Sequence, residues 1–266
     1  MALGVNTNVG AMVALQNLSK TNRDLEVTQG RINTGLAVAG AKDNGGIYAI
    51  AQAMRSDVAS LGAVGQSLGR AKSVVDVALA AGESISDLLV QMKEKAVAAA
   101  DASTDTTARA ALNEDFVALR KQISSIVSNA AFNGVNLINT ATGFQSLASA
   151  DGSSKISVNA ENLSLGGSII TIAATGQVNT QSAASTMLGT VNTSLTNANR
   201  ALARLGSISK RLDTQMEFNN KVSDALKAGI GNLVDADLSV ESARLQSLQV
   251  KQQLGLQALS IANGAP

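Results

Sequence analysis

The residue types that most often carry catalysis and metal binding are scarce in this sequence. Its 266 residues contain no histidine and no cysteine, which removes the commonest metal ligand, the commonest general base and every thiol nucleophile. Asp235 and Asp237 could serve as paired carboxylates for acid–base chemistry, but side chains two positions apart diverge on a helix. We therefore expect a structural or capping role for these two residues.

Two other features could suggest chemistry. Gly45 and Gly46 might open a phosphate-binding loop, yet no Lys-Ser/Thr pair follows them and no strand precedes them, so we interpret them as a flexible connector. The charge-poor middle of the chain carries Asp151, Lys155 and Glu161 as its main ionisable groups, which is too few for acid–base catalysis. We expect a protein that is not an enzyme and has no catalytic residue, cofactor or metal.

Charge and hydropathy limit the partners. The formal net charge is +1, from 21 basic and 20 acidic residues, so no electrostatic footprint for nucleic acid is present. No apolar run approaches the roughly 20 residues that a membrane span needs. Residues 1–10 lack the basic and apolar segments of a cleavable secretory signal. Composition alone therefore predicts a cytoplasmic protein, unless a signal-independent export route exists.

Long helices are expected to position the functional residues of this chain. Aromatic residues make up only 2% of it, and its single proline is Pro266, so small aliphatic side chains can pack closely and no interior proline breaks a helix. From Ile47 to about Ala100, two apolar rows repeat every seven residues and are broken only by Asp57 and Gly82. This pattern predicts one helix of roughly 80 Å.

The remaining elements complete a bundle. A second helix is predicted over Thr104–Ala130, folding back antiparallel, and a third from Leu188 to about Leu226. Between them, alternating residues on either side of Asp151-Gly152 predict a β-hairpin, and 169–172 suggests another strand. We expect a mainly α fold: a long antiparallel helical bundle with terminal coiled-coil helices and a small β-hairpin region.

The two ends of the chain are also predicted to be helical and apolar. From Leu238 to Ala265 the only charged residues are Glu241, Arg244 and Lys251, and aliphatic residues surround the helix on all sides. A lone pair of helices cannot bury such a helix, which points to neighbouring subunits or to disorder in the monomer. The residues predicted to drive self-assembly are Leu15, Leu18, Leu25, Ile32, Leu36, Leu238, Leu245, Leu248, Leu254, Leu259 and Ile261.

Three blocks of sequence resemble the bacterial flagellins. The first runs from Asn6-Thr7-Asn8 to Ala41-Lys42-Asp43, the second is Phe132–Leu137, and the third runs from Asp235 to Asn263. They occur in the family's order and frame nearly the whole chain. The signature residues are Asn6, Arg31, Gly35, Lys42, Asp43, Phe132, Asn133, Gly134, Asp237 and Asn263.

The resemblance implies an architecture. Residues 1–36 and 238–266 would form the filament core, 37–46 and 230–237 would be connectors, and 47–229 would form the next shell, with its hairpin region at about 130–185. Such a chain is a minimal flagellin with only the two inner shells. The sequence ends at Gly264-Ala265-Pro266, before the short apolar tail that is common in the family, so we expect a shortened C-terminus.

The resemblance also implies a function. A flagellin is a non-catalytic subunit that polymerises into the extracellular flagellar filament for swimming. It is secreted unfolded by the flagellar type III apparatus. The implied partners are further copies of the chain, the export machinery and its chaperone, the filament cap and the hook–filament junction proteins.

Three alternatives compete with this interpretation. A hook–filament junction protein shares the terminal helices but is disfavoured by the match through Phe132–Leu137. A secreted enzyme that uses flagellin ends as an export tag is disfavoured by the few ionisable groups in the middle. A signalling coiled coil is disfavoured by the charge-poor hairpin region and the missing membrane span.

Overall fold

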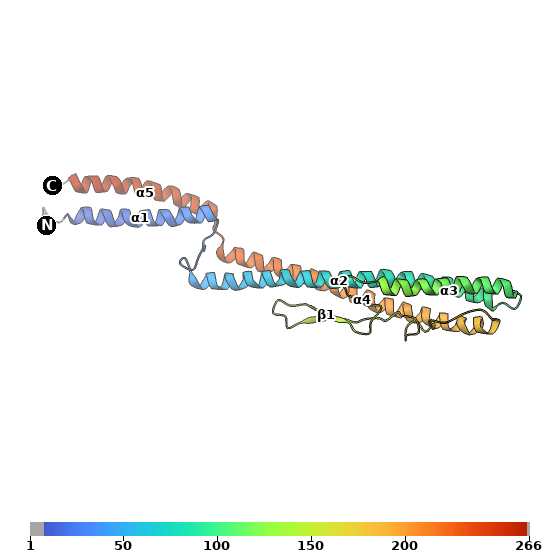
Figure 1. The fold of residues 1–266 in the computed structure, drawn as a ribbon. Helices are drawn as coiled ribbons and strands as arrows, with labels where there is room; N and C mark the ends of the chain where they lie inside the picture. The colour runs from blue at the N-terminus through green and yellow to red at the C-terminus, as the bar shows by residue number, and fades with distance from the viewer. Residues whose placement is uncertain (1–7, 265–266) are drawn as a thin grey trace. The chain divides into compact units, whose positions relative to one another are not determined.

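The computed structural model describes residues 8–264, and helices dominate this part of the chain (Figure 1). Contacts divide it into two compact units, one holding the chain up to Val58 and from Asp224 onward, the other holding Ala59–Ser223. None of the described helices is long and apolar enough to cross a membrane. The elements are α1 (Val9–Thr34), α2 (Gly45–Ala100), α3 (Thr106–Asn129), β1 (Phe144–Leu147), β2 (Lys155–Val158), α4 (Gln181–Val234) and α5 (Leu238–Gly264).

The predicted mainly α fold, with long helices and a small hairpin, is confirmed. In the second unit, the seven-residue rows of α2 are its buried face: Leu68, Val75 and Leu89 are fully buried. Gly82, which interrupts one row, leaves room for a neighbour, because a Cβ added there would lie 2.6 Å from Cδ2 of Leu202 on α4. The glycine is therefore part of the helix packing.

The turn between α2 and α3 is closed by polar side chains. The Asp105 carboxylate accepts a hydrogen bond from the Ala108 amide at 2.7 Å and caps α3. Arg109 donates from Nε to the Ala99 carbonyl at 2.8 Å and from Nη2 to the Asp101 carbonyl at 3.0 Å. These bonds satisfy carbonyls that the end of α2 leaves without helical partners.

A tight turn and a hairpin follow α3. Asn133 and Gly134 have φ values of 49° and 79°, and Phe132 and Val135 exchange backbone hydrogen bonds of 2.9 and 3.0 Å across them. Positive φ at both central positions is the geometry of a type I′ turn, which asparagine and glycine favour. Farther on, β1 and β2 pair antiparallel, with Phe144 opposite Val158.

The strand suggested at 169–172 is absent from the described structure. Ile170 and Ile172 are fully buried, so the apolar residues of this segment do belong to the hydrophobic core. The amide of Thr171 donates to the Ser194 hydroxyl of α4 at 3.0 Å. Because a helix side chain takes this backbone donor, no neighbouring strand pairs with the segment.

The second predicted connector, 230–237, is shorter than expected, and the first, 37–46, is displaced toward the N-terminus. The helix α4 was expected to end at about Leu226 but continues to Val234, because Val234 is buried with Val38 and Ala51 in a small core of the first unit. The pair Gly45-Gly46 was expected to be a flexible connector. Both glycines lie in the first turn of α2, where the Asn44 side chain accepts from the Ile47 amide at 3.1 Å and caps the helix.

Replacing either of two glycines of the second unit by alanine should change the stability in opposite directions. Gly62 is an exposed glycine inside α2 with nothing within 4 Å of an added Cβ, whereas a Cβ at Gly143 would overlap the Val158 carbonyl oxygen. Gly62→Ala should raise the free energy of unfolding by about 0.5–1 kcal/mol, and Gly143→Ala should lower it by roughly 1–3 kcal/mol. Urea denaturation followed by circular dichroism measures both. Equal effects of the two substitutions would contradict this packing.

The tip of the β-hairpin should hold its structure to low pH. Hydrogen bonds from the Ser149 hydroxyl and from the Ser153 hydroxyl and amide lower the pKa of Asp151 from 3.8 to about 2. A depressed carboxyl pKa contributes stability that is fully present above pH 3.8 and is lost as the pH falls through about 2. The ¹³C chemical shift of the Asp151 carboxyl group should therefore titrate near pH 2. A midpoint close to the ordinary value would show that these bonds do not form in solution, and Asp151→Asn provides the control spectrum.

Candidate functional site

The helices α1 and α5 pack against each other in the first unit and run antiparallel (Figure 1). Asn8 at the start of α1 donates to the Ala262 carbonyl near the end of α5 at 2.7 Å. Midway along the pair, Gln252 donates to the Asn22 side-chain oxygen at 2.8 Å. Contacts at both levels show that the two helices stay paired along most of their length.

Only a narrow seam between these helices is buried. Leu25 and Thr28 of α1 and Leu248 of α5 are buried, and an added Cβ at Gly255 would lie 3.3 Å from Leu18 Cδ1. Of the residues predicted to drive self-assembly, Leu25 and Leu248 are thus buried inside the pair, while Leu18, Ile32, Leu36, Leu245 and Leu259 are half-buried. Six of these seven residues hold α1 and α5 together or lie at the edge of their seam, whereas Leu36 packs against the small core of Val38, Ala51 and Val234.

The seam also contains an ion pair. Arg31 Nη1 lies 2.9 Å from Glu241 Oε1, and the Glu241 side chain is only 9% exposed. Arg31 Nε and Glu241 Oε2 are buried and have no partner in the described part of the chain. The bond is therefore a single one rather than a bidentate pair. It links a signature residue of α1 to the only acidic side chain of α5.

Glu241 did not stand out in the sequence analysis, although a signal for it was present. It lies seven residues before Leu248 and fourteen before Gly255, so all three share one face of α5. That spacing places a carboxylate in a seam that is otherwise apolar or small. A search for charged residues on the buried heptad positions could have found it.

Other signature residues shape the ends of these helices. Gly35 has φ 71° and ends α1 with a left-handed cap, its amide donating to the Arg31 carbonyl at 2.8 Å. Leu36 therefore lies beyond α1, in an antiparallel bridge with Asp235. Asp237 caps α5 by accepting from the amides of Ser239 and Val240 at 2.9 and 3.1 Å. The capping role expected for Asp237 is confirmed.

The remaining signature residues lie elsewhere. The Asp43 carboxylate accepts from the amides of Ala39 and Gly40, both at 3.0 Å, and closes the loop before α2. Lys42 and Asn263 are exposed. Phe132, Asn133 and Gly134 form the type I′ turn of the second unit, and Asn6 lies outside the described residues.

Four of the predicted assembly residues point away from the seam. Leu15, Leu238, Leu254 and Ile261 are 54%, 50%, 57% and 73% exposed. The sequence analysis missed further aliphatic side chains of α1 and α5 that are about half exposed or more. These are Val9, Met12, Val13, Val27, Val240, Val250 and Leu256.

The exposed residues of α5 are ordered. Val240, Leu254 and Ile261 belong to a row that repeats every seven residues and is interrupted once, by the exposed Ser247. The row lies one position before the row that contains Glu241 and Leu248. Each residue turns a helix by about 100°, so this row faces away from the seam with α1. We call Val240, Val250, Leu254 and Ile261 the outer face of α5. A heptad repeat on a second face is typical of a helix that packs against a second partner.

Comparisons with known proteins identify the family. The family model for the bacterial flagellin N-terminal helical region matches residues 5–143, and that for the flagellin C-terminal helical region matches residues 188–266. Flagellins FljM and FljK of Caulobacter vibrioides are each 53% identical to this chain over 265 residues, which covers 99% of this chain and 96% of theirs. A flagellin of Brucella melitensis biotype 1 is 37% identical, covering 97% of this chain and 95% of its own.

A solved structure agrees with these matches. The crystal structure of Bacillus cereus flagellin superposes with a TM-score of 0.51 at 25% identity, covering 56% of this chain and 86% of that one. The second unit thus carries the long helices and short hairpin of a flagellin, and the first carries paired terminal helices with an uncovered apolar face. This chain belongs to the bacterial flagellin family.

Proposed function

We propose that the outer face of α5 and the exposed aliphatic residues of α1 are the surfaces through which this flagellin joins its neighbours. As a flagellin, the chain is a structural subunit that polymerises with itself into the extracellular flagellar filament. The observation that carries the proposal is the exposure of Val240, Val250, Leu254 and Ile261 on a helix whose seam face is already paired with α1. Several exposed apolar side chains grouped on one side of a helix are typical of an interaction site.

Burial of this surface supplies the driving force. Fully burying one valine, leucine or isoleucine side chain stabilises a structure by about 1.5–3 kcal/mol. The four residues of the outer face therefore supply enough to offset part of the translational and side-chain entropy lost on association. In a helical filament each subunit meets the next one head to tail, so the contact is heterologous. A heterologous contact whose rotation does not close produces an open helical polymer.

We assign the predicted shells on the same basis. Residues 1–36 and 238–266 form the filament core, residues 47–229 form the next shell, and short connectors join them. The charge distribution supports this arrangement. In the stretch from Leu238 to Ala265 only Glu241, Arg244 and Lys251 are charged, and Glu241 is already paired with Arg31, which suits a helix enclosed by other subunits.

The remaining parts of the proposal concern export and partners. The chain acts without catalysis and leaves the cell unfolded through the flagellar type III apparatus. Its further partners are the export chaperone, the filament cap and the hook–filament junction proteins. The lack of cysteine supports this route, because a chain without thiols needs no oxidation step after export.

Polar substitution on the outer face should block assembly and leave the monomer intact. Val250 and Leu254 are 54% and 57% exposed, so Val250→Ser with Leu254→Ser removes apolar surface that the monomer does not bury. We expect the concentration of monomer that remains unpolymerised to rise by at least tenfold, measured by sedimentation after assembly. Gln253→Ser, an exposed polar position on the same helix, is the matched control. Normal filaments from the double variant would refute the assignment of this face.

Removing the buried carboxylate should loosen the terminal helices themselves. Glu241→Ala leaves the Arg31 guanidinium half-buried without its partner, which costs about 1–3 kcal/mol. Amides of α1 and α5 should then exchange with deuterium about tenfold faster or more, as measured by mass spectrometry on the monomer. Replacing both partners, as Arg31→Met with Glu241→Leu, should recover most of the protection. Unchanged exchange in Glu241→Ala would show that the ion pair does not hold the helices together.

A further inference from the structure

The apolar packing of α2 and α4 in the second unit does not define a single alignment. Buried residues of α2 recur every seven positions at Leu61, Leu68 and Val75, and those of α4 do so at Ala198, Leu205 and Leu212. Moving α4 along α2 by seven residues, or about 10.5 Å, would bring a buried row onto the same positions again. Hydrophobic burial alone would therefore tolerate more than one register.

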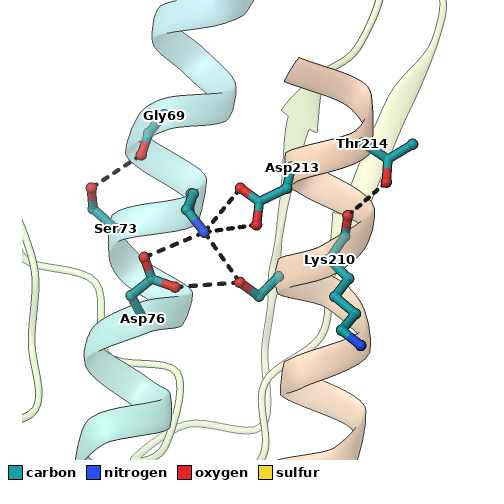
Figure 2. A network of polar contacts seen from close by, with 8 residues as sticks. Gly69, Ser73, Asp76, Lys210, Asp213 and Thr214 are labelled. Carbon is teal, nitrogen blue, oxygen red and sulfur yellow. Dashed lines mark hydrogen bonds and ion pairs between the residues drawn. The ribbon is translucent and has the colours of Figure 1, made fainter. Parts of the chain in front are cut away.

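Polar side chains between the two helices distinguish these registers. Lys72 Nζ of α2 lies 2.9 Å from Asp213 Oδ1 of α4. The Ser209 hydroxyl donates to Asp76 Oδ1 at 3.3 Å, and Lys72 Nζ donates to the Ser209 hydroxyl at 3.4 Å. Lys72 Nζ also lies 3.7 Å from Asp76 Oδ2 on its own helix. We call Lys72, Asp76, Ser209 and Asp213 the register network (Figure 2).

The network is continuous across the interface. Figure 2 shows Asp76 and Asp213 facing the same space from opposite helices, and dashed lines join each carboxylate to the Lys72 ammonium nitrogen between them. The hydroxyls of Ser73 and Thr214 are drawn back to carbonyls of their own helices, Gly69 at 3.1 Å and Lys210 at 3.0 Å. They therefore offer no substitute partners across the interface.

We infer that the register network selects the alignment in which α2 and α4 pair. Asp76 lies four residues after Lys72 on α2, and its partner Ser209 lies four residues before Asp213, the partner of Lys72, on α4. Both contacts therefore fit the same antiparallel alignment. A third contact obeys the same alignment, because the Ser86 hydroxyl donates to the Asn199 side-chain oxygen at 3.2 Å. One register of α2 against α4 allows all of these contacts to form.

A shift of seven residues would break every bond of the network between the helices. Lys72 would then lie opposite Gly206 or Asn220. Asp76 would lie opposite Leu202 or Met216. Neither charge would meet an opposite charge. The Asp76 and Asp213 side chains are 49% and 54% exposed and would keep much of their hydration, whereas Lys72 is 31% exposed, so water would compensate its lost partners only in part. A polar residue placed among aliphatic ones is known to specify register in helix pairs in this way.

The charge on Lys72 persists under ordinary conditions. Its hydrogen bond to the Asp213 carboxylate raises the pKa of the Lys72 ammonium group above its usual value of 10.5. The close fit of Leu202 over Gly82 also favours the observed register. That contact involves the end of a flexible side chain, which can rotate, so it discriminates less between registers than the loss of the Lys72 ion pair does.

The register matters to the rest of the second unit. Arg204 of α4 forms two hydrogen bonds of 2.6 Å to the buried Glu161 carboxylate, and Gln215 donates to the Ala148 carbonyl beyond β1 at 3.0 Å. A displaced α4 would lose all three bonds and move the hairpin. Identical subunits must repeat along a filament, so a unit folded in another register could not take a regular place. The inference itself concerns the monomer and does not depend on how the subunits assemble.

Engineered disulfides can test the register, because the natural chain contains no cysteine. Ser86→Cys with Asn199→Cys reports the observed alignment, since the natural side chains there lie 3.2 Å apart. Ser86→Cys with Asn192→Cys, and Ser86→Cys with Gly206→Cys, report shifts of seven residues in either direction. Each pair is placed in the natural background and in a background carrying Lys72→Met and Asp213→Leu. The proteins are refolded from urea in a glutathione buffer, and the disulfide-bonded fraction is measured by mass spectrometry.

In the natural background we expect efficient disulfide formation only in the variant that carries Ser86→Cys with Asn199→Cys. In the network-free background, the ratio of shifted to observed disulfides should rise at least tenfold, while the midpoint of thermal unfolding should not fall, because aliphatic side chains replace an ion pair. A lower midpoint with an unchanged ratio would overturn the inference, since it would show that the network only adds stability.

Two single substitutions keep the test decisive. Lys72→Arg retains the cation and should keep the natural ratio. If the network-free protein does not fold, Lys72→Met alone is examined with the same cysteine pairs. A rise in its ratio of at least tenfold supports the inference, and an unchanged ratio overturns it.

Discussion

Two helices can bury only the faces that they turn toward each other, and this constraint governs the terminal part of the flagellin. Aliphatic residues surround α5, yet α1 covers only the strip that contains Leu248. The outer face therefore remains exposed to water, which is unfavourable because apolar surface is stabilised when it is buried. A chain that keeps such a face uncovered as a monomer has a built-in tendency to associate, which is what a filament subunit requires.

In each unit, a pair of opposite charges lies between two helices. In the first unit, Glu241 lies in a narrow seam and meets Arg31. In the second unit, Lys72 and Asp213 meet between long aliphatic rows. Aliphatic burial supplies most of the stabilisation in each case but discriminates weakly between alignments. Specific pairs of charges add discrimination, because a misplaced charge loses its partner and, where the side chain is buried as Glu241 is, has little water to replace it.

Local sequence patterns predicted the helices and the hairpin accurately, and the ends of the helices less accurately. The seven-residue rows from Ile47 predicted α2, and the residues around Asp151-Gly152 predicted the hairpin. The errors arose where tertiary contacts outweigh local preference. Burial of Val234 extends α4 into a predicted connector, and Ser194 takes the backbone donor of a predicted strand at 169–172. Neither contact can be seen in the local sequence, because the partners lie far apart along the chain.

The sequence by itself determined the class of this protein: helical periodicity, the lack of cysteine and histidine, and the flagellin signatures are all local or compositional properties. It also identified apolar ends that need partners. Only the tertiary structure decided which of those residues face inward and which remain open, so Leu248 could be separated from Leu254. The physical reason is that side-chain direction follows from the rotation of each helix against its neighbour. That rotation is set by pairings such as Arg31 with Glu241, 210 residues apart in the chain.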